Sequence, residues 1–217
     1  MTGRLLLVTG FEPFGGERVN ASWEAARPLD GWRGDGFIAA ARELPCVYDA
    51  CRTELIGLIE TLRPAALMMT GQATRRALIC VERLARNDAS ATAPDNRGVV
   101  RGLAPPDPGA PWLETKARAG EIAGAIRDDG GPVRVSFNAG GFVCNHLYYG
   151  MLAWLGARAP LMPAVFIHLP ATPAQLPGRK GGLATERSTR ALRAAAAPLM
   201  ASVRASGTEA IRNQSAA

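Results

Sequence analysis

Short, continuous runs of apolar residues recur along the chain, each closed by glycine, proline or a polar residue. Runs of this kind are typical of strands that are buried on both faces of a parallel sheet. They predict strands at residues 4–9, 37–44, 65–70, 133–137 and 164–168. Residues 78–84 are also apolar, but the segment is short enough to be either a strand or a turn.

Other segments repeat their apolar residues with the 3.6-residue period of a helix that packs one face on a core. In residues 50–62, for example, Leu55, Ile56, Ile59 and Leu62 fall on one side. Helices are likewise predicted at residues 111–126, 144–156 and 183–202, and we expect residues 205–217 to be a frayed tail. Residues 87–111 form the longest irregular region, and such loops in compact domains are usually functional or mobile.

The alternation of predicted strands and helices indicates the fold class. Connections that contain a helix are long enough to join parallel strands, so we predict an α/β fold with a mostly parallel sheet and helices on both faces. With 217 residues, of which 47% are hydrophobic, the chain can bury a substantial core, and no repeat or linker divides it. We therefore expect one domain over residues 1–217.

The charge balance weighs against a polyanionic partner. The formal net charge is +6, but Lys116 and Lys180 are the only lysines and the arginines are dispersed. A composition rich in Ala, Gly, Pro and Arg is typical of a genome-wide amino-acid bias, so we expect no nucleic-acid partner. A nucleic-acid binder is the weakest alternative, and it would be retained on DNA or RNA in a strongly salt-dependent way.

Cysteine usage and hydropathy indicate the compartment. The four cysteines form neither CxxC pairs nor a dense disulfide scaffold. The apolar run at the N-terminus is far shorter than that of a signal peptide, and no segment reaches the roughly 18 to 20 apolar residues that span a bilayer. We expect reduced thiols, a cytoplasmic location and no membrane partner.

Candidate chemistry lies where the predicted strands end, because ligands of open parallel sheets gather beyond the carboxyl ends of the strands. Cys144 follows a glycine-rich turn and begins a predicted helix, where free amides and the helix dipole favour a thiolate. The other cysteines, Cys46, Cys51 and Cys80, are interpreted as packing residues. The glycines after the first strand match neither a P-loop nor a dinucleotide fingerprint.

A nucleophilic thiol needs a general base, and the chain has two histidines. His146 follows Cys144 by two positions on the same predicted helix, so its ring points about 200° away around the helix axis. His168 ends a predicted strand, at the sheet edge where Cys144 is expected. His168 is therefore the better candidate for the base, and His146 is interpreted as a capping or packing residue.

The group that orients the imidazole stays open at this point. A carboxylate is the usual choice because it fixes the tautomer and stabilises the imidazolium. Glu12, Glu82, Asp88 and Asp95 all lie in segments that could reach the crevice. Backbone amides near residues 140–144 could form an oxyanion hole, because glycine lets the backbone approach a reacting carbonyl closely.

Two phenylalanines, Phe11 and Phe14, lie in the turn-like segment after the first strand. Large apolar rings are unfavourable at the surface unless something covers them. Either they pack beneath the loop, or they form the wall of a pocket for a flat, uncharged ligand.

A set of motifs follows in a characteristic order between residue 4 and about residue 170. They read LVTGFEPFGG at 7–16, NASW at 20–23, GQA at 71–73, VERLARN at 81–87, PDNRG at 94–98, GFVCNH at 141–146 and FIHLP at 166–170. Together they resemble the class I pyroglutamyl peptidases, also called pyrrolidone carboxylate peptidases.

The resemblance implies a cysteine exopeptidase that hydrolyses the N-terminal pyroglutamyl residue from peptides through an acyl-enzyme, with no cofactor and no metal. It places the nucleophile of the family on Cys144, its histidine on His168 and its acid on Glu82. The oxyanion amides would be those of Gly141 and Cys144.

The resemblance also implies a lactam pocket. The aromatic residues that hold the lactam in the family match Phe11, Phe14 and Phe142, and Gln72 matches a glutamine beside that pocket. The family fold is a single α/β domain with a twisted central sheet, often assembled as a homotetramer, so we expect a homo-oligomer whose substrates are peptides with N-terminal pyroglutamate.

The chain departs from the family pattern beside this pocket. Thr92 and Ala93 stand where arginine and a bulky aliphatic residue are common, and Gly141 stands where threonine is usual. These differences predict a looser pocket. They keep two alternatives open: a thiol hydrolase of another small lactam or amide, and a catalytically inactive relative that retains the pocket.

Overall fold

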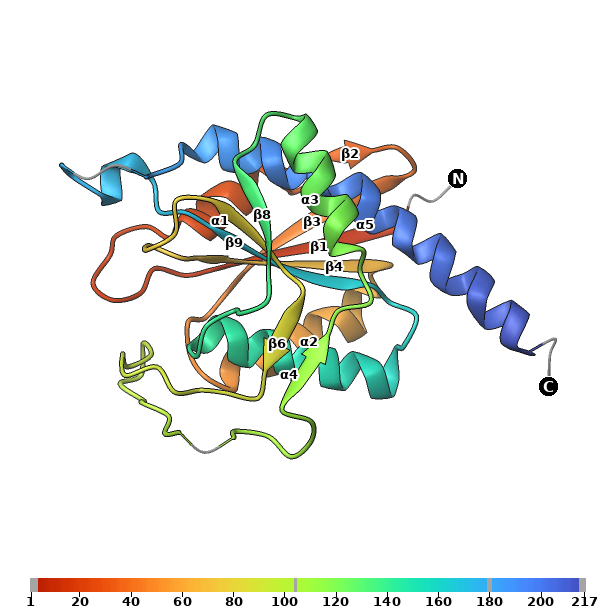
Figure 1. Cartoon of the computed structure of the whole chain (residues 1–217), viewed down its shortest axis with the longest axis horizontal. Helices are drawn as coiled ribbons and strands as arrows, with labels where there is room; N and C mark the ends of the chain where they lie inside the picture. Colours follow the sequence, from red (N-terminus) through yellow and green to blue (C-terminus); the bar gives the residue numbers. More distant parts are fainter. Residues whose placement is uncertain (1–3, 104, 179–180, 215–217) are drawn as a thin grey trace.

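A seven-stranded sheet forms the centre of the molecule (Figure 1). The structure is a computed structural model that describes residues 4–103, 105–178 and 181–214. In spatial order the strands are β2 (Arg33–Gly34), β3 (Phe37–Leu44), β1 (Arg4–Phe11), β4 (Ala66–Gln72), β9 (Ala164–Leu169), β5 (Ile79–Glu82) and β8 (Val133–Ser136). A separate antiparallel pair joins β6 (Leu84–Arg86) to β7 (Trp112–Glu114).

The central strands are parallel and buried on both faces. β1 pairs in parallel with β3 and with β4, and β4 pairs in parallel with β9. Every residue of β4 and β9 is buried, as are the last six residues of β1. This two-sided burial explains why these strands are continuous apolar runs in the sequence rather than alternating patterns.

Helices cover both faces of the sheet (Figure 1). One face carries α1 (Ala21–Ala26), α3 (Ala119–Asp128) and α5 (Thr185–Gln214), and the other carries α2 (Ala50–Leu62) and α4 (Val143–Arg158). Each layer has its own core, with Ile122, Ile126 and Leu192 in one and Leu55, Leu147 and Tyr148 in the other. The predicted α/β class, with a mostly parallel sheet between two helical layers, is confirmed.

β5 runs against its neighbour β9. In this antiparallel register Cys80 pairs with His168 and Glu82 pairs with Phe166, whereas β5 and β8 are parallel. Directly paired residues lie on the same face of a sheet, and so do residues two apart along a strand. Glu82 and His168 are therefore diagonal neighbours on one face.

The prediction of one helix over residues 111–126 is wrong. Residues 112–114 form β7, and the helix in this region is Ala119–Asp128. β7 pairs with β6, in a register that sets Leu113 opposite Ala85. This pairing of distant segments overrides the local helical pattern. The ambiguous residues 78–84 contribute to two strands, β5 and β6.

Short elements and the chain end also differ from the predictions. α1 and β2 were not predicted, because six and two residues are too few to show a period. α1 is recognisable by its N-cap, where the Asn20 side chain accepts a hydrogen bond from the Ser22 N–H.

The last helix continues to Gln214 rather than fraying from residue 205, and residues 215–217 lie outside the described part of the chain. Within the described ranges, no helix is long and apolar enough to cross a membrane.

Candidate active site

A pocket at the carboxyl ends of β4 and β9 holds two of the predicted catalytic side chains. It has a volume of about 450 Å³ and is lined by Phe14, Gln72, Ala73, Thr74, Arg75, Arg76, Ala139, Gly140, Phe142, Cys144 and His168. This volume is within the usual range of ligand-binding pockets. The lining residues come from four separate parts of the chain, so the pocket exists only in the folded protein.

Glu82 and His168 form a buried pair at this pocket. Glu82 Oε1 lies 2.8 Å from His168 Nδ1, and the two side chains are 0% and 5% exposed. Burial raises the pKa of Glu82, but the hydrogen bond and charge of His168, together with the charge of Arg76, outweigh burial and lower this pKa below its ordinary value. Glu82 is therefore an anion that holds a proton on Nδ1 and leaves Nε2 of His168 as the acceptor.

The three other candidate carboxylates are engaged elsewhere. Glu12 accepts hydrogen bonds from a backbone N–H and from an asparagine side chain. Asp95 accepts three backbone N–H groups, and Asp88 accepts one. Of the four carboxylates that the sequence left open, the fold brings Glu82 to His168.

Cys144 is the second residue of α4, and its side chain is partly exposed whereas those of the other three cysteines are buried. Burial, with a contribution from the negative charge of Glu82, raises the pKa of the Cys144 thiol to about 12. Desolvation therefore opposes the thiolate that the N–H groups of the helix N-terminus favour. Among the described residues no hydrogen bond joins this thiol to His168, and such contacts often tighten only when substrate binds.

Gly71 makes room for the thiol. This residue of β4 pairs with His168, and a Cβ atom placed on it would lie 2.7 Å from Cys144 Sγ and 2.9 Å from the Phe166 ring. Carbon atoms do not approach neighbours this closely, so the absence of a side chain lets the sulfur rest against the β4 backbone. The first residue of the GQA motif is therefore a glycine because any side chain at this position would collide with the Cys144 thiol.

The turn before α4 contributes Ala139, Gly140 and Phe142 to the lining of the pocket. Gly140 has a φ of +86°, which favours glycine, and Gly141 accepts a hydrogen bond from the Ala91 N–H at 2.9 Å. The N–H groups in the first turn of a helix have no acceptor within that helix. The amides of Gly141 and Cys144 therefore lie where a fixed turn meets a helix N-terminus.

The predicted pocket aromatics take two different positions. Phe14 and Phe142 line the pocket with their ring centroids 5.8 Å apart, and Tyr48 packs edge-on against Phe142. Phe11, in contrast, is 2% exposed in the core under this region and is not among the described residues that line the pocket. Phe14 therefore forms part of the pocket wall, whereas Phe11 packs beneath the loop, so each of the two interpretations given for these phenylalanines applies to one of them.

Gln72 lines the pocket and also holds its surroundings. Its Oε1 accepts a hydrogen bond from the Ala21 N–H at 2.7 Å, and its Nε2 donates to Thr74 Oγ1 at 3.1 Å. The side chain thereby connects the start of α1 to the turn after β4. In the described ranges no group of three or more His, Cys, Asp or Glu side chains is placed to hold a metal ion.

A family model for pyroglutamyl peptidases matches residues 4–202. The chain belongs to the pyroglutamyl peptidase family. The pyrrolidone-carboxylate peptidase of Escherichia fergusonii is 40% identical over 196 residues, which cover 88% of this chain and 91% of that protein. The corresponding peptidase of Chromobacterium violaceum is 44% identical over 175 residues, covering 79% of this chain and 80% of that protein.

Solved structures agree with this assignment. The crystal structure of pyroglutamyl peptidase I from Bacillus amyloliquefaciens matches with a TM-score of 0.88 at 33% identity, covering 92% of this chain and 96% of that one. The sequence resemblance to the pyroglutamyl peptidase family of cysteine peptidases is thus confirmed.

Arg76 is a residue of this pyroglutamyl peptidase site that the sequence analysis missed. Its guanidinium lies 2.5 Å from Glu82 Oε1 and 2.6 Å from the carbonyl oxygen of Asn138. It therefore ties the acid to the loop after β8. In the sequence, Arg76 is only an arginine six positions before Glu82, and neither helical nor strand periodicity predicts a contact between residues at that separation.

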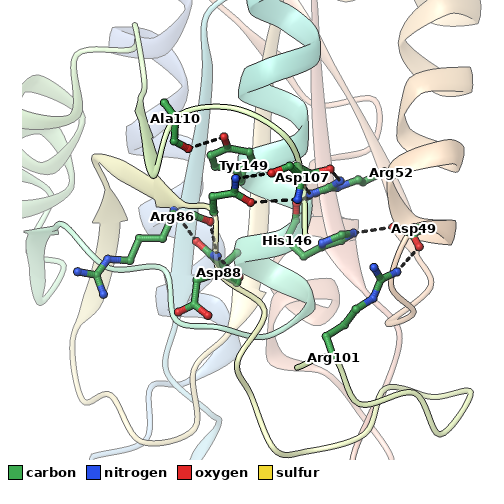
Figure 2. Close-up of polar contacts among 11 residues, drawn as sticks. Asp49, Arg52, Arg86, Asp88, Arg101, Asp107, Ala110, His146 and Tyr149 are labelled. Atoms are coloured by element: carbon green, nitrogen blue, oxygen red, sulfur yellow. Dashed lines mark hydrogen bonds and ion pairs between the residues drawn. The ribbon is translucent and has the colours of Figure 1, made fainter. Parts of the chain in front are cut away.

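His146 is not among the described residues that line the pocket, and its ring lies in a separate polar cluster with Asp49, Arg52 and Asp107 (Figure 2). Its Nε2 lies 2.9 Å from Asp49 Oδ1, and its buried Nδ1 has no hydrogen-bond partner among the described residues. Burial, aided by the positive charge of Arg52, lowers the pKa of His146 to about 4. The ring is therefore neutral, and its direction agrees with the helical spacing from Cys144.

This second cluster attaches the long loop to α2 and α4 (Figure 2). Arg52 of α2 donates to both carboxylate oxygens of Asp107 and to the carbonyl of His146. Arg101 forms an ion pair with Asp49, and Tyr149 Oη donates to the carbonyl of Ala110 at 2.6 Å. The loop is therefore held against the helix that carries Cys144.

Proposed function

We propose that this chain removes the N-terminal pyroglutamyl residue from peptides, with Cys144 as nucleophile, His168 as general base and Glu82 as the acid that orients His168. The observation that carries the proposal is the 2.8 Å contact between Glu82 and His168 at the pocket that also contains Cys144. This arrangement of nucleophile, base and orienting carboxylate is the general pattern of acyl-transfer enzymes.

The reaction follows from the protonation states. His168 Nε2 takes the thiol proton, and the sulfur of Cys144 attacks the carbonyl carbon of the pyroglutamyl residue. The N–H groups of Gly141 and Cys144 stabilise the oxyanion. The C–N bond then breaks, the leaving amine takes the proton from His168, and pyroglutamate stays bound to sulfur as a thioester. Water, deprotonated by His168, hydrolyses the thioester and regenerates the thiol.

The pocket chemistry supports a neutral lactam as the group that is recognised. Phe14 and Phe142 offer aromatic faces to a planar ring. No Asp or Glu is among the described residues that line the pocket, so a free substrate ammonium would find no carboxylate there. Phe11 supports this wall from the core, and Gln72 holds the turn beside it.

A fluorogenic pyroglutamyl amide, assayed under reducing conditions, tests the proposal. We expect cleavage that iodoacetamide abolishes and that Cys144→Ala lowers by at least about 10³-fold. Cys51→Ala removes a buried thiol outside the pocket and should retain activity. Absence of thiol-sensitive cleavage would indicate an inactive relative, and faster cleavage of prolyl or alanyl amides would indicate a thiol hydrolase of another amide.

We also infer a homo-oligomer, a tetramer by family resemblance, in the cytoplasm. Four unpaired cysteines fit a reducing compartment. Val99, Val100 and Leu103 of the long loop are exposed, Leu103 to 89%, and exposed apolar groups of this kind often mark contacts between chains. Light scattering of the purified protein measures the oligomeric state directly.

A further inference from the structure

A fixed turn at the mouth of the pocket presents an arginine to solvent. The Ala73 N–H donates to the carbonyl of Leu169 at 2.8 Å, and the Arg76 N–H donates to the carbonyl of Ala73 at 2.9 Å, which closes the turn. Arg75 is the third residue of this turn. It is exposed, and it lines the same pocket as Cys144 and His168.

The charge of Arg75 is uncompensated. Its neighbour Arg76 is bound to Glu82 and to the carbonyl of Asn138, so the positive charge of Arg76 is balanced within the site. Arg75 has no hydrogen bond or ion pair in the described part of the chain, and no carboxylate is among the residues that line the pocket there. The mouth of the pocket therefore carries a free guanidinium.

The lactam itself has no charge for this guanidinium to bind. The scissile bond joins the α-carbonyl carbon of the pyroglutamyl residue, which lies outside the lactam ring, to the nitrogen of the next residue, so the rest of the peptide must leave the pocket past its mouth. A guanidinium there pairs best with a carboxylate, through charge-assisted hydrogen bonds.

We propose that Arg75 is a specificity-determining residue that favours peptides with a carboxylate directly after the pyroglutamyl residue. This inference rests on the proposed function. The carboxylate can be an Asp or Glu side chain in the second position, or the terminal carboxylate of a pyroglutamyl dipeptide. Both sources present the same group to Arg75.

Four substrates separate these sources: the amides of pyroglutamyl-alanine, pyroglutamyl-glutamate and pyroglutamyl-lysine, and pyroglutamyl-alanine with a free carboxylate. For the parent we expect kcat/KM about two- to five-fold higher for the glutamate amide than for the alanine amide, the range of a partly exposed ion pair, and lowest for the lysine amide. The free acid reports whether a terminal carboxylate also reaches Arg75. High salt should weaken each preference.

Three variants test the residue. Arg75→Gln should remove the ratio between acidic and neutral substrates, and Arg75→Glu should reverse it in favour of lysine. Arg127→Gln makes the same change of charge at an exposed position on α3, outside the pocket, and should keep the parent ratio.

Two results would overturn the inference: a parent without charge preference, or an equal loss on all four substrates in Arg75→Gln, which would give Arg75 a general role in catalysis. Failure of the parent to cleave even the alanine amide would instead contradict the proposed function.

Discussion

Gly71 leaves just enough space for the thiol of Cys144, the proposed nucleophile, and a single added methyl group would occupy that space. The Cβ of an alanine there would lie 2.7 Å from Cys144 Sγ. Gly71→Ala should therefore displace the sulfur and lower kcat by about 10²-fold, the usual effect of a misplacement near 1 Å. Steady-state kinetics with the pyroglutamyl amide measures this loss.

Gly57→Ala is the matched control for that substitution. Gly57 lies inside α2 with no atom within 4 Å of the added Cβ, so the change should keep activity and stabilise the protein by about 0.5–1 kcal/mol. Parent-like turnover in Gly71→Ala would show that the thiol does not need this space.

Glu82 is the second residue at which a small change should have a large effect. Glu82→Gln keeps the size of the side chain but removes the anion that stabilises the imidazolium of His168. We expect kcat/KM for the pyroglutamyl amide to fall by roughly 10²–10⁴-fold in steady-state kinetics. Parent-like kcat/KM in Glu82→Gln would mean that Glu82 does not act through His168.

How far the sequence predicts this site differs from residue to residue. Local context was enough to single out Cys144, which follows a glycine-rich turn, and His168, which ends an apolar strand. It was not enough for Glu82 or Arg76, because both contact the site through loops and strand pairs whose partners are distant in sequence. The family resemblance, rather than spacing, selected Glu82.

At the scale of elements, the direction in which β5 runs in the sheet determines that Glu82 lies beside His168. β5 is antiparallel to β9, which sets Glu82 diagonal to His168 on one face. Each strand alone is an apolar run, and its residues do not show in which direction it enters the sheet. The same limit explains β7, where pairing with β6 overrides a helical pattern.

His146 lies where α4 meets α2 and the long loop, and its titration should make the free energy of unfolding depend on pH. Its pKa is 6.5 in an ordinary setting and about 4 in the fold, so between these values the unfolded chain binds more protons. The stability is fully present above about pH 6.5 and decreases as the pH falls toward 4, by up to about 3 kcal/mol. The physical reason is that a proton on Nδ1 would be buried without a partner.

Urea unfolding followed by tryptophan fluorescence at pH 7, 6 and 5 checks this dependence. His146→Gln keeps a donor for Asp49 but cannot titrate, so its free energy of unfolding should change less over the same interval. Equal slopes in the parent and the variant would contradict the role of His146.

At the scale of the whole molecule, packing of the two helical layers on the sheet should leave one cysteine thiol accessible to reagents and shield the other three. Cys46, Cys51 and Cys80 are buried, whereas Cys144 is partly exposed at the pocket. We expect iodoacetamide to modify one thiol per native chain and four after unfolding in denaturant. Mass spectrometry counts the adducts, and the native protein with Cys144→Ser should take up none. A second native adduct would show that one of the layers opens.

The sequence by itself determined the α/β class, most strand positions, the helices α2, α4 and α5, and the two residues that carry the thiol and the imidazole. These features follow from apolar periodicity and from turn residues, which depend on near neighbours in the chain. The tertiary structure alone decided the direction of β5, the contact of Glu82 and Arg76, the space at Gly71 and the burial that raises the pKa of the Cys144 thiol. Each of these depends on which distant segments meet and on how completely water is excluded where they meet, and neither is encoded in a local pattern.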